Sequence, residues 1–397
     1  MIFKLRNRTE SVIVMKKLSD KVTFKHGAVI NNRMVQPPML TNSGLNGMVS
    51  EDTISYWKAR ANSAGLVISE YNYVSPAGGP AITWADNRTQ LAVYDDKFLP
   101  GLTKMAKTMK SGGNKALLQI AHTGREANYR AHLGLPVYAP DSANYPFLPY
   151  GVQGFTAEQV EQVVKDFGRA TKRAIEAGFD GVEIHGANHY LIQQFFSRFS
   201  NHRQDKWGDY EAFPLAVAKE VFEVVRKYAP HDFIIGYRIS PEEINPGNVG
   251  YTWHESTKLI DALTNNFDFD YIHLSLPDYK AKPKDSDKTF AELFRPVIGK
   301  ETKLIIVGDV MSQEAAEDAL KYTDLVAAGR AQIIDANFAA KVVAGKGDKV
   351  ITELSDEEEK QQALTLGLRK VMDKQTKRPN FAKMLQGLDY SKAIKVK

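Results

Sequence analysis

Short apolar runs alternate with longer amphipathic stretches along most of the chain, beginning near residue 30. Each run is rich in Val, Ile and Leu at successive positions, as expected of strands buried on both faces of a parallel sheet. The pattern predicts eight such strands. They are Met34–Met39, Leu66–Glu70, Ala116–Ile120, Gly181–His185, Phe233–Ile239, Tyr271–Ser275, Leu304–Val307 and Leu325–Ala327.

The amphipathic stretches between these runs predict helices. Ser50 is a suitable N-cap, and acidic residues follow it in the expected first turn. From Thr156 to Ala177 apolar residues recur at helical spacing, and Gly178 supplies a C-terminal stop. Further helices are expected at Phe213–Lys227, Ser256–Leu263, Phe290–Gly299, Ser312–Tyr322 and Ala336–Ala344.

Strands followed by helices predict an α/β fold, a (β/α)₈ TIM barrel. A doubly wound open sheet is the alternative, but no G-x-G-x-x-G follows the first strand. The two longest loops, His122–Phe155 and Gly186–Asp209, both follow strands. In a barrel these elaborated βα loops would lie over the C-terminal face, where catalytic residues gather.

Three segments are expected along the chain. Residues 1–21 form an N-terminal leader of uncertain role, and residues 22–350 form the barrel. Residues 351–397 form a C-terminal extension, a charged helix followed by a Lys-rich tail, that packs on the barrel.

Composition narrows the class of protein. Of 397 residues, 43% are hydrophobic and 25% charged, which is typical of a globular chain with a sizeable core. The net charge of +5 comes without a basic block, so nucleic-acid binding is not expected. Zero cysteines exclude disulfides, thiolate zinc sites and Fe–S clusters, and the histidines include no H-E-x-x-H motif and no helical pair with a third ligand. With no signal sequence and no apolar run of about 18 residues, we expect a cytoplasmic enzyme without a membrane span or a metal.

The densest polar cluster follows the fourth strand and contains His185, Asn188 and Tyr190. An imidazole and a carboxamide three residues apart on a turn can both donate hydrogen bonds to one oxygen atom. The tyrosine adds a proton donor suited to a carbanion-like carbon. A structural role for the strand-end histidine is about equally compatible with the sequence alone.

Two more strands carry polar side chains. Gln119 offers a donor and an acceptor, as the amide edge of a heterocyclic ring requires. Arg238 is a fixed charge in a strand expected to be buried, so it needs an anionic partner from a ligand or from the protein. An Arg–Glu pair inside the barrel mouth is the structural alternative.

Glycine turns follow the last two strands, as Gly308-Asp309 and as Ala328-Gly329-Arg330. The loops after strands 7 and 8 of barrels often bind phosphate through backbone N–H groups. Arg330 could clamp such a phosphate with its planar guanidinium. One ligand fits all these groups, a flavin mononucleotide (FMN) lying across the barrel mouth.

Together these motifs resemble the Old Yellow Enzyme family of FMN-dependent oxidoreductases. The resemblance runs from about Val22 to about residue 345. The matching elements are Asn32–Met39, Gln119–Arg125, His185–Phe195, Asn201–Asp205, Arg238–Pro241 and Gly329-Arg330.

The resemblance implies roles for individual residues. His185 and Asn188 would bind the carbonyl or nitro oxygen of a substrate, and Tyr190 would be the proton donor. The remaining positions would contact FMN. These are Pro38, Met39, Leu40, Gln119, Arg238, Gly308, Asp309, Ala328, Gly329 and Arg330.

Two positions depart from the family pattern. His189 stands where the motif has Gly, and Leu40 stands where the family usually has Thr or Cys near the flavin C4 oxygen and N5. Leu40 can donate no hydrogen bond, and Thr41 should point to the opposite side if the strand continues.

The expected reaction is reduction of an activated alkene or related electrophile by NADH or NADPH through bound FMN. A phosphate-binding barrel lyase or isomerase without flavin is one alternative, although no lysine stands at a strand end to favour it. A flavin-binding protein without alkene reductase activity is the other. The sequence leaves the substrate, the choice between NADH and NADPH, and the oligomeric state open.

Overall fold

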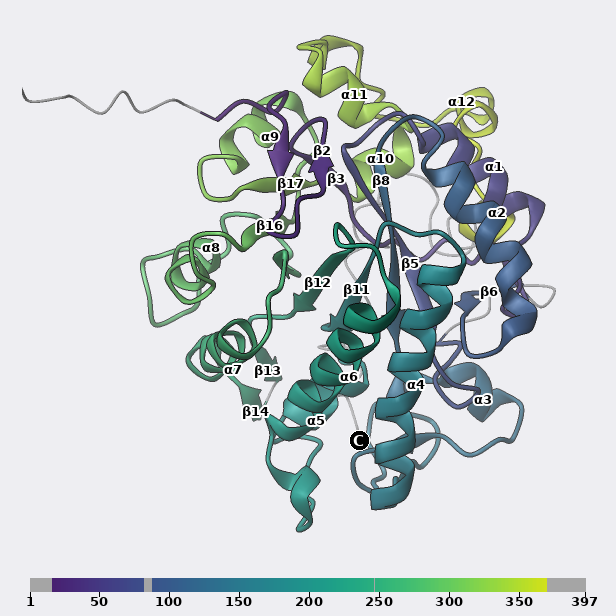
Figure 1. The fold of residues 1–397 in the computed structure, drawn as a ribbon, viewed down its shortest axis with the longest axis vertical. Coiled ribbons are helices and arrows are strands. Elements are labelled where there is room, and N and C mark those ends of the chain that lie inside the picture. The colour runs from purple at the N-terminus through teal and green to yellow at the C-terminus, as the bar shows by residue number, and fades with distance from the viewer. Residues whose placement is uncertain (1–15, 82–87, 246, 370–397) are drawn as a thin grey trace, which may run out of the picture.

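Eight parallel strands form a barrel in the computed structural model, which describes residues 16–81, 88–245 and 247–369 (Figure 1). The barrel strands are β3 (Met34–Gln36), β5 (Leu66–Tyr73), β8 (Lys115–Ala121), β11 (Gly181–Gly186), β12 (Ile234–Ile239), β15 (Tyr271–Leu274), β16 (Lys303–Val307) and β17 (Leu325–Ala327).

The sheet closes on itself because β3 pairs in parallel with both β5 and β17. Every neighbouring pair around the ring is parallel. The expected TIM barrel is therefore confirmed, and the open-sheet alternative is excluded. One strand prediction was too long, since β3 ends at Gln36 and the chain leaves the sheet before Met39.

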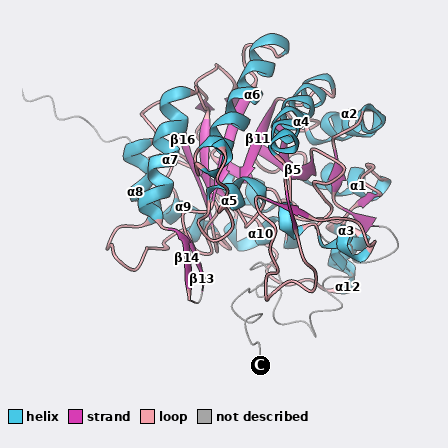
Figure 2. Ribbon diagram, turned by 90° about the horizontal axis from the view of Figure 1, so that it is seen from below, coloured by secondary structure: helices cyan, strands magenta, loops and turns pink. Residues whose placement is uncertain are grey.

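The major helices surround the barrel strands (Figure 2). They are α1 (Glu51–Arg60), α2 (Leu99–Met109), α4 (Ala157–Glu176), α6 (Ala212–Tyr228), α7 (Trp253–Asn266), α8 (Phe290–Phe294), α9 (Gln313–Ala319), α10 (Arg330–Ile334) and α11 (Phe338–Val343). The Ser50 hydroxyl caps α1 as expected, and the Thr156 hydroxyl caps α4, each within a complete capping box. Helix α8 is shorter than expected because Pro296 follows it within a 3₁₀ turn, η4 (Arg295–Val297).

Helix α2 was missing from the sequence-based expectations. It begins Leu99-Pro100-Gly101, and Pro and Gly together suggest a loop. Proline is nevertheless favoured in the first helical turn, where its missing N–H costs nothing. The buried face of α2 consists of Leu102, Met105, Ala106 and Met109 at helical spacing.

A small hairpin covers the N-terminal end of the barrel. Strands β1 (Val22–Thr23) and β2 (Val29–Ile30) pair antiparallel, and Phe24 lies in the turn between them, 2% exposed. The Phe24 ring contacts Tyr271 inside the barrel, with ring centroids 6.2 Å apart. This hairpin and the lowest inward-facing side chains form one apolar cluster.

The opposite end carries the short elements inserted after the strands. They are β4 (Gly44–Leu45), β6 (Arg88–Thr89), β7 (Leu91–Ala92), η1 (Asp96–Phe98), η2 (Gly124–Glu126), α3 (Asn128–His132), β9 (Tyr138–Ala139), β10 (Gln153–Gly154), α5 (Leu191–Phe196), η3 (Lys206–Gly208), β13 (Glu243–Asn245) and β14 (Asn248–Tyr251). The β13–β14 hairpin stands out from the body of the molecule (Figure 2).

The C-terminal part begins with η5 (Gly347–Lys349) and α12 (Asp356–Gln361). The expected charged helix is thus only six residues long. Leu364 and Leu368 are buried against the barrel core. The predicted Lys-rich tail from residue 370 onward and most of the predicted leader, residues 1–15, lie outside the described residues. In the part of the chain that the structure covers, no helix has the length and apolar character of a membrane span.

Candidate active site

Three polar side chains lie side by side on adjacent strands near the C-terminal end of the barrel. His185 on β11 pairs in register with Arg238 on β12, which pairs with His273 on β15. All three are buried, His273 completely. A nitrogen of each side chain, His185 Nδ1, Arg238 Nε and His273 Nε2, has no hydrogen-bond partner. Buried polar atoms without partners are costly and mark a place where a ligand is expected to supply them.

Glu183, two residues before His185 on the same face of β11, is the centre of a buried hydrogen-bond network. Its carboxylate accepts from Gln119 Nε2 at 2.7 Å, Tyr271 Oη at 3.0 Å and His273 Nδ1 at 2.9 Å. Burial raises the pKa of Glu183, but the His273 ring and the Arg238 charge outweigh it, so the net pKa is lowered. Gly236 makes room for this network, because a Cβ there would lie 2.0 Å from the Tyr271 ring.

The network changes the interpretation of Gln119 and Arg238. Gln119 was expected to face a ring edge, and here its amide donates to Glu183. Arg238 donates from Nη2 to Ser275 Oγ at 3.1 Å, and among the described residues it forms no ion pair within 4.0 Å. The predicted Arg–Glu alternative is therefore present only as a longer-range attraction to Glu183.

Asn188 belongs to the same cluster. Its Nδ2 donates to Ser275 Oγ at 3.2 Å, the hydroxyl that Arg238 also contacts, and its backbone N donates to Ser240 Oγ at 3.0 Å. The Asn188 side chain is exposed, and its amide carries a second N–H. Asn188 is thus the exposed member of the cluster, linked to Arg238 through Ser275.

His185 is held in its neutral form. Burial lowers its pKa well below the ordinary value, and the positive charge of Arg238 lowers it further. A neutral imidazole donates through one ring nitrogen and accepts through the other. Tyr190 packs against it with ring centroids 5.1 Å apart in an edge-to-face arrangement, so the three predicted residues do gather at one place.

The turn that carries Asn188 and Tyr190 has an unusual backbone. Asn188 and His189 both adopt left-handed conformations, with φ of 57° and 62°. Glycine adopts this conformation without strain, whereas histidine does so rarely. The His189 ring is instead anchored: its Nδ1 lies 3.3 Å from Gln193 Nε2 and 3.8 Å from the buried carboxylate of Glu243. The side chain of His189, which stands where the family motif has Gly, thus supports the turn.

Tyr71 is a residue of this site that the sequence did not reveal. The register between β5 and β8 shifts by one residue after Ile68, so that Tyr71 pairs with Gln119. Such a bulge re-aims a side chain, here toward the barrel mouth. The Tyr71 and Tyr190 rings meet edge to face at 5.1 Å.

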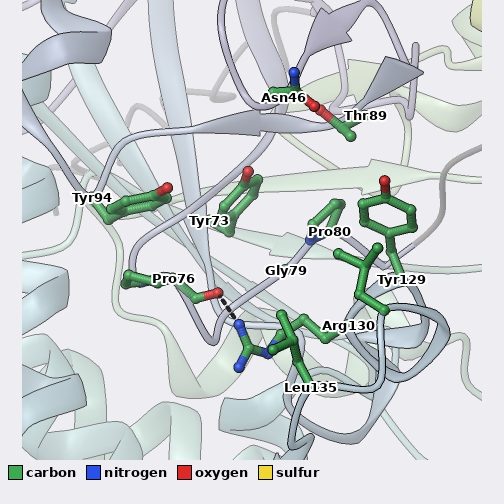
Figure 3. Close-up of a pocket in the computed structure, with 11 residues that line it drawn as sticks. Asn46, Tyr73, Pro76, Gly79, Pro80, Thr89, Tyr94, Tyr129, Arg130 and Leu135 are labelled. Atoms are coloured by element: carbon green, nitrogen blue, oxygen red, sulfur yellow. Dashed lines mark hydrogen bonds between the residues drawn. The ribbon is translucent and has the colours of Figure 1, made fainter. Parts of the chain in front are cut away.

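Tyr73, also on β5, faces a different cavity. It lines a pocket with Pro76, Pro80, Tyr94 and Tyr129, in which Arg130 Nη1 donates to the Pro76 carbonyl at 2.7 Å (Figure 3). None of His185, Asn188 and Tyr190 lines this pocket. The polar cluster at the barrel mouth is therefore the candidate active site.

The predicted phosphate loops lie next to each other, because Val307 and Ala327 pair at the ends of β16 and β17. Gly308 has a φ of 135°, and a Cβ there would lie 2.7 Å from the Asp278 backbone nitrogen. A Cβ on Gly329 would lie 2.8 Å from Met39 Sδ. Arg330 forms an ion pair with Asp309, so its guanidinium already has one anionic partner.

The segment after β3 carries Leu40 and Thr41. Leu40 is partly buried against the core, and Thr41 directs its hydroxyl to the buried Glu70, with Oγ1 2.6 Å from Glu70 Oε1. The Thr41 backbone N donates to the other carboxylate oxygen at 2.9 Å. Burial raises the pKa of Glu70 to about 7 in spite of these hydrogen bonds.

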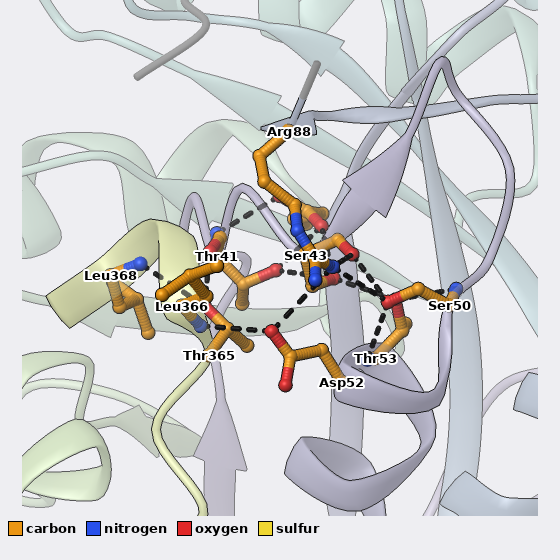
Figure 4. A network of polar contacts seen from close by, with 10 residues as sticks. Thr41, Ser43, Ser50, Asp52, Thr53, Arg88, Thr365, Leu366 and Leu368 are labelled. Carbon is orange, nitrogen blue, oxygen red and sulfur yellow. Dashed lines mark hydrogen bonds and ion pairs between the residues drawn. The ribbon is translucent and has the colours of Figure 1, made fainter. Parts of the chain in front are cut away.

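The C-terminal segment is tied to the same region. Thr365 donates from its hydroxyl to the Thr41 carbonyl, and the Leu366 backbone N donates to Asp52 Oδ2 at 2.9 Å (Figure 4). Arg88 and Ser50 both contact Ser43 in this network, Arg88 Nη1 at 3.2 Å from the Ser43 carbonyl. The C-terminal residues thus support the loop that carries Leu40.

A family model described as "NADH:flavin oxidoreductase / NADH oxidase family" matches residues 18–349. The chain belongs to this family. The chain is 39% identical over 349 residues to the Bacillus subtilis (strain 168) protein named "Probable NADH-dependent flavin oxidoreductase YqiG", covering 85% of this chain and 90% of that one. It is also 37% identical to the NADH:acrylate oxidoreductase of Vibrio harveyi over 86% of this chain, but spans only 34% of that larger protein.

Solved structures show the same fold. The old yellow enzyme homologue from Zymomonas mobilis superimposes with a TM-score of 0.73 at 20% identity, covering 88% of this chain and 99% of that one. Morphinone reductase in complex with tetrahydroNAD gives a TM-score of 0.70 at 23% identity, covering 87% and 94% of the two chains. The predicted resemblance to the Old Yellow Enzyme family is confirmed.

As a member of this flavin oxidoreductase family, the protein is an oxidoreductase that uses FMN with NADH or NADPH as reductant. The described residues fit that cofactor in two ways. His185, Arg238 and His273, neighbours near the ends of three adjacent strands, each have a buried nitrogen without a partner. The two loops where the phosphate is expected also have glycine at positions 308 and 329, where a Cβ would lie 2.7 Å from the Asp278 backbone nitrogen and 2.8 Å from Met39 Sδ.

Proposed function

We propose that this enzyme reduces activated alkenes, namely α,β-unsaturated carbonyl compounds, nitroalkenes or quinones. The observation that carries the proposal is the neutral, buried His185 with an unpartnered Nδ1, grouped with the exposed Asn188 and with Tyr190 at 5.1 Å. Two preorganised donors and a phenol match what such a reduction requires.

In this proposal His185 and Asn188 donate hydrogen bonds to the carbonyl or nitro oxygen of the substrate. Negative charge grows on that oxygen as hydride reaches the β-carbon, and donors fixed in a buried site stabilise it without reorganising. Tyr190 then protonates the α-carbon. Bound FMN supplies the hydride, which it takes from NADH or NADPH.

The cofactor would be held by residues from several strand ends. Arg238 would face the ring, with its charge stabilising the reduced form, and Gln119 would contact the ring while its Nε2 donates to Glu183. Pro38, Met39 and Leu40 would line one edge. The phosphate would lie at Gly308, Asp309, Ala328, Gly329 and Arg330. Arg330 forms an ion pair with Asp309. To bind the phosphate, the Arg330 guanidinium would have to give up at least part of that ion pair.

A second candidate function is transfer of electrons from NADH to another acceptor without alkene reduction. It is favoured by the relative named "NADH oxidase" from Thermoanaerobacter brockii, which is 32% identical over 81% of this chain, while this chain covers only 50% of that protein. The name of that enzyme refers to a protein much longer than this chain, so its activity does not decide between the two candidates.

Isotope labelling of the product separates the two candidates. The FMN-loaded enzyme is reduced anaerobically with 4-deuterated NADH and mixed with 2-cyclohexenone, a nitroalkene or a quinone. Deuterium should appear at the β-carbon of the reduced alkene, and in D₂O with unlabelled NADH it should appear at the α-carbon. Rapid oxidation of NADH by dioxygen or dyes, with every alkene recovered unchanged, would support the second candidate instead.

A further inference from the structure

The Tyr71 hydroxyl is held between two groups of the protein. Its oxygen accepts from the Ala81 backbone N at 3.0 Å, and it donates to Gln90 Oε1 at 2.8 Å. The Gln90 amide is fixed in turn, because its Nε2 donates to Asn42. A fully buried phenol with these contacts has a defined oxygen position but a proton that can rotate.

The phenol that packs against Tyr71 is Tyr190. The bulge after Ile68 brings Tyr71 to the mouth, where the Tyr71 and Tyr190 rings meet edge to face with centroids 5.1 Å apart. Without the bulge, residue 70 would occupy the inward register position beside Gln119. The irregular backbone therefore places one phenol against the other.

Tyr190 is otherwise poorly suited to give up a proton. Burial raises its pKa above the ordinary value, and the carboxylates of Glu70 and Glu126 raise it further. His185 packs against its ring but is neutral. A hydrogen bond donated by Tyr71 to the Tyr190 oxygen would act in the opposite direction and lower the pKa of Tyr190.

We propose that Tyr71 is a positioning residue that stabilises the Tyr190 phenolate during alkene reduction, its O–H turning from Gln90 to the Tyr190 oxygen. The inference rests on the proposed function, in which Tyr190 protonates the substrate. In that step the O–H bond of Tyr190 breaks, a C–H bond forms at the α-carbon, and the electron pair stays on the Tyr190 oxygen. A solvent proton later restores the phenol. The Ala81 N–H keeps the Tyr71 oxygen in place while its proton moves.

The first test compares Tyr71→Phe with Tyr73→Phe, a matched loss of one hydroxyl from the same strand. In the FMN-loaded enzyme, Tyr71→Phe should slow oxidation by 2-cyclohexenone about 10- to 100-fold, as expected for one hydrogen bond to a charged group. Reduction by NADH needs no proton from Tyr190 and should be unchanged. Tyr73→Phe should leave both half-reactions unchanged.

Tyr190→Phe separates this inference from the proposed function. If Tyr190→Phe reduces the alkene at the wild-type rate, Tyr190 is not the proton donor and the proposed function loses that step. If Tyr190→Phe is slow but Tyr71→Phe behaves like Tyr73→Phe, only the inference about Tyr71 is wrong. The double variant should be no slower than Tyr190→Phe, and a further loss would mean that Tyr71 acts independently.

A readout other than activity follows the two phenols directly. With ring-¹³C-labelled tyrosine, the Tyr190 resonance is assigned by its loss in Tyr190→Phe, and its pKa should rise in Tyr71→Phe. Incorporating 3-fluorotyrosine at position 71 keeps the hydroxyl and makes it a stronger donor, so the pKa of Tyr190 should fall. This variant also serves if Tyr71→Phe fails to fold. An unchanged Tyr190 titration in both variants would overturn the proposal.

Discussion

The two ends of the barrel are built from the same eight strands but differ in whether their buried polar groups have hydrogen-bond partners. At the N-terminal end the β1–β2 hairpin, with Phe24, covers an apolar cluster, and the buried Asp270 is fully engaged. Its carboxylate accepts from the Ile235 backbone N at 2.8 Å and lies 2.9 Å from His26 Nδ1. At the C-terminal end His185, Arg238 and His273 each retain a buried nitrogen without a partner.

The difference shows which end of the barrel contributes to the stability of the fold and which end is available for catalysis. A satisfied, closely packed end contributes free energy of unfolding, while unsatisfied buried groups cost free energy unless a ligand completes them. Substitutions at the two ends should therefore have different effects on stability and on catalysis. Changes near the hairpin should affect stability alone, and changes at the mouth should affect chemistry with little effect on stability.

The largest effect is expected at the covered end. Phe24→Ala should lower the free energy of unfolding by about 3–5 kcal/mol, since it leaves a cavity under the hairpin. Urea unfolding measures this loss, and the folded fraction should keep its wild-type turnover. Val29, 44% exposed on the same hairpin, offers a control whose replacement by Ala should have little effect. A loss of turnover in folded Phe24→Ala would contradict the separation.

At the mouth, His185→Ala should lower the rate of alkene reduction about 10²–10³-fold, the usual effect of removing one preorganised donor. FMN content and the unfolding midpoint should stay close to wild type, because other residues are proposed to hold the cofactor and His185 Nδ1 contributes no internal hydrogen bond. Stopped-flow kinetics and absorbance spectra check both points. Loss of FMN or unfolding would instead assign His185 a structural role.

Glu70 should make part of the stability depend on pH. Its pKa rises from 4.5 to about 7 on folding, so between these values the folded protein holds a proton that the unfolded chain has lost. Stability should then fall as pH rises from about 4.5 to 7, by on the order of 3 kcal/mol, and stay level above that.

Glu70→Gln is the control for that titration. The amide can accept from the Thr41 backbone N through its oxygen and donate to the Thr41 hydroxyl through its nitrogen. Urea unfolding of both proteins between pH 5 and pH 8 should show a difference that shrinks toward low pH. Parallel curves would mean that Glu70 titrates normally.

The smallest effect is expected at Leu40. The Thr41 hydroxyl is engaged by Glu70, so Leu40→Thr should introduce a hydrogen bond to the flavin that the wild type lacks. One such bond, about 0.5–1.5 kcal/mol, corresponds to a rise of about 10–30 mV in the midpoint potential. Spectroscopic redox titration compares the two proteins. A midpoint that stays the same or falls would mean that the position is already satisfied.

The sequence was informative where local signals decide the structure. Apolar runs located the barrel strands, and Ser50 and Thr156 located helix starts, because strand burial and capping depend on neighbouring residues. The cluster of His185, Asn188 and Tyr190 was likewise visible, since it lies within six residues of one strand end.

What the sequence did not reveal depends on contacts between distant segments. Tyr71 reaches the mouth only through a shift in register against β8, and no local signal encodes that shift. The raised pKa of Glu70 likewise depends on its complete burial in the folded barrel, against a loop that carries Thr41. Glu183 could have been found, because it precedes His185 by two positions in a strand and must share its face.

The closure of the barrel between β3 and β17 also has a consequence for synthesis of the chain. Of the residues proposed to hold FMN, Leu40 follows the first barrel strand, while Gly308, Gly329 and Arg330 follow the last two. A ribosome-bound chain that ends before β17 has no complete seam, so it cannot yet present both sides of the proposed FMN site. We therefore expect cofactor insertion only after nearly all of the barrel has been translated.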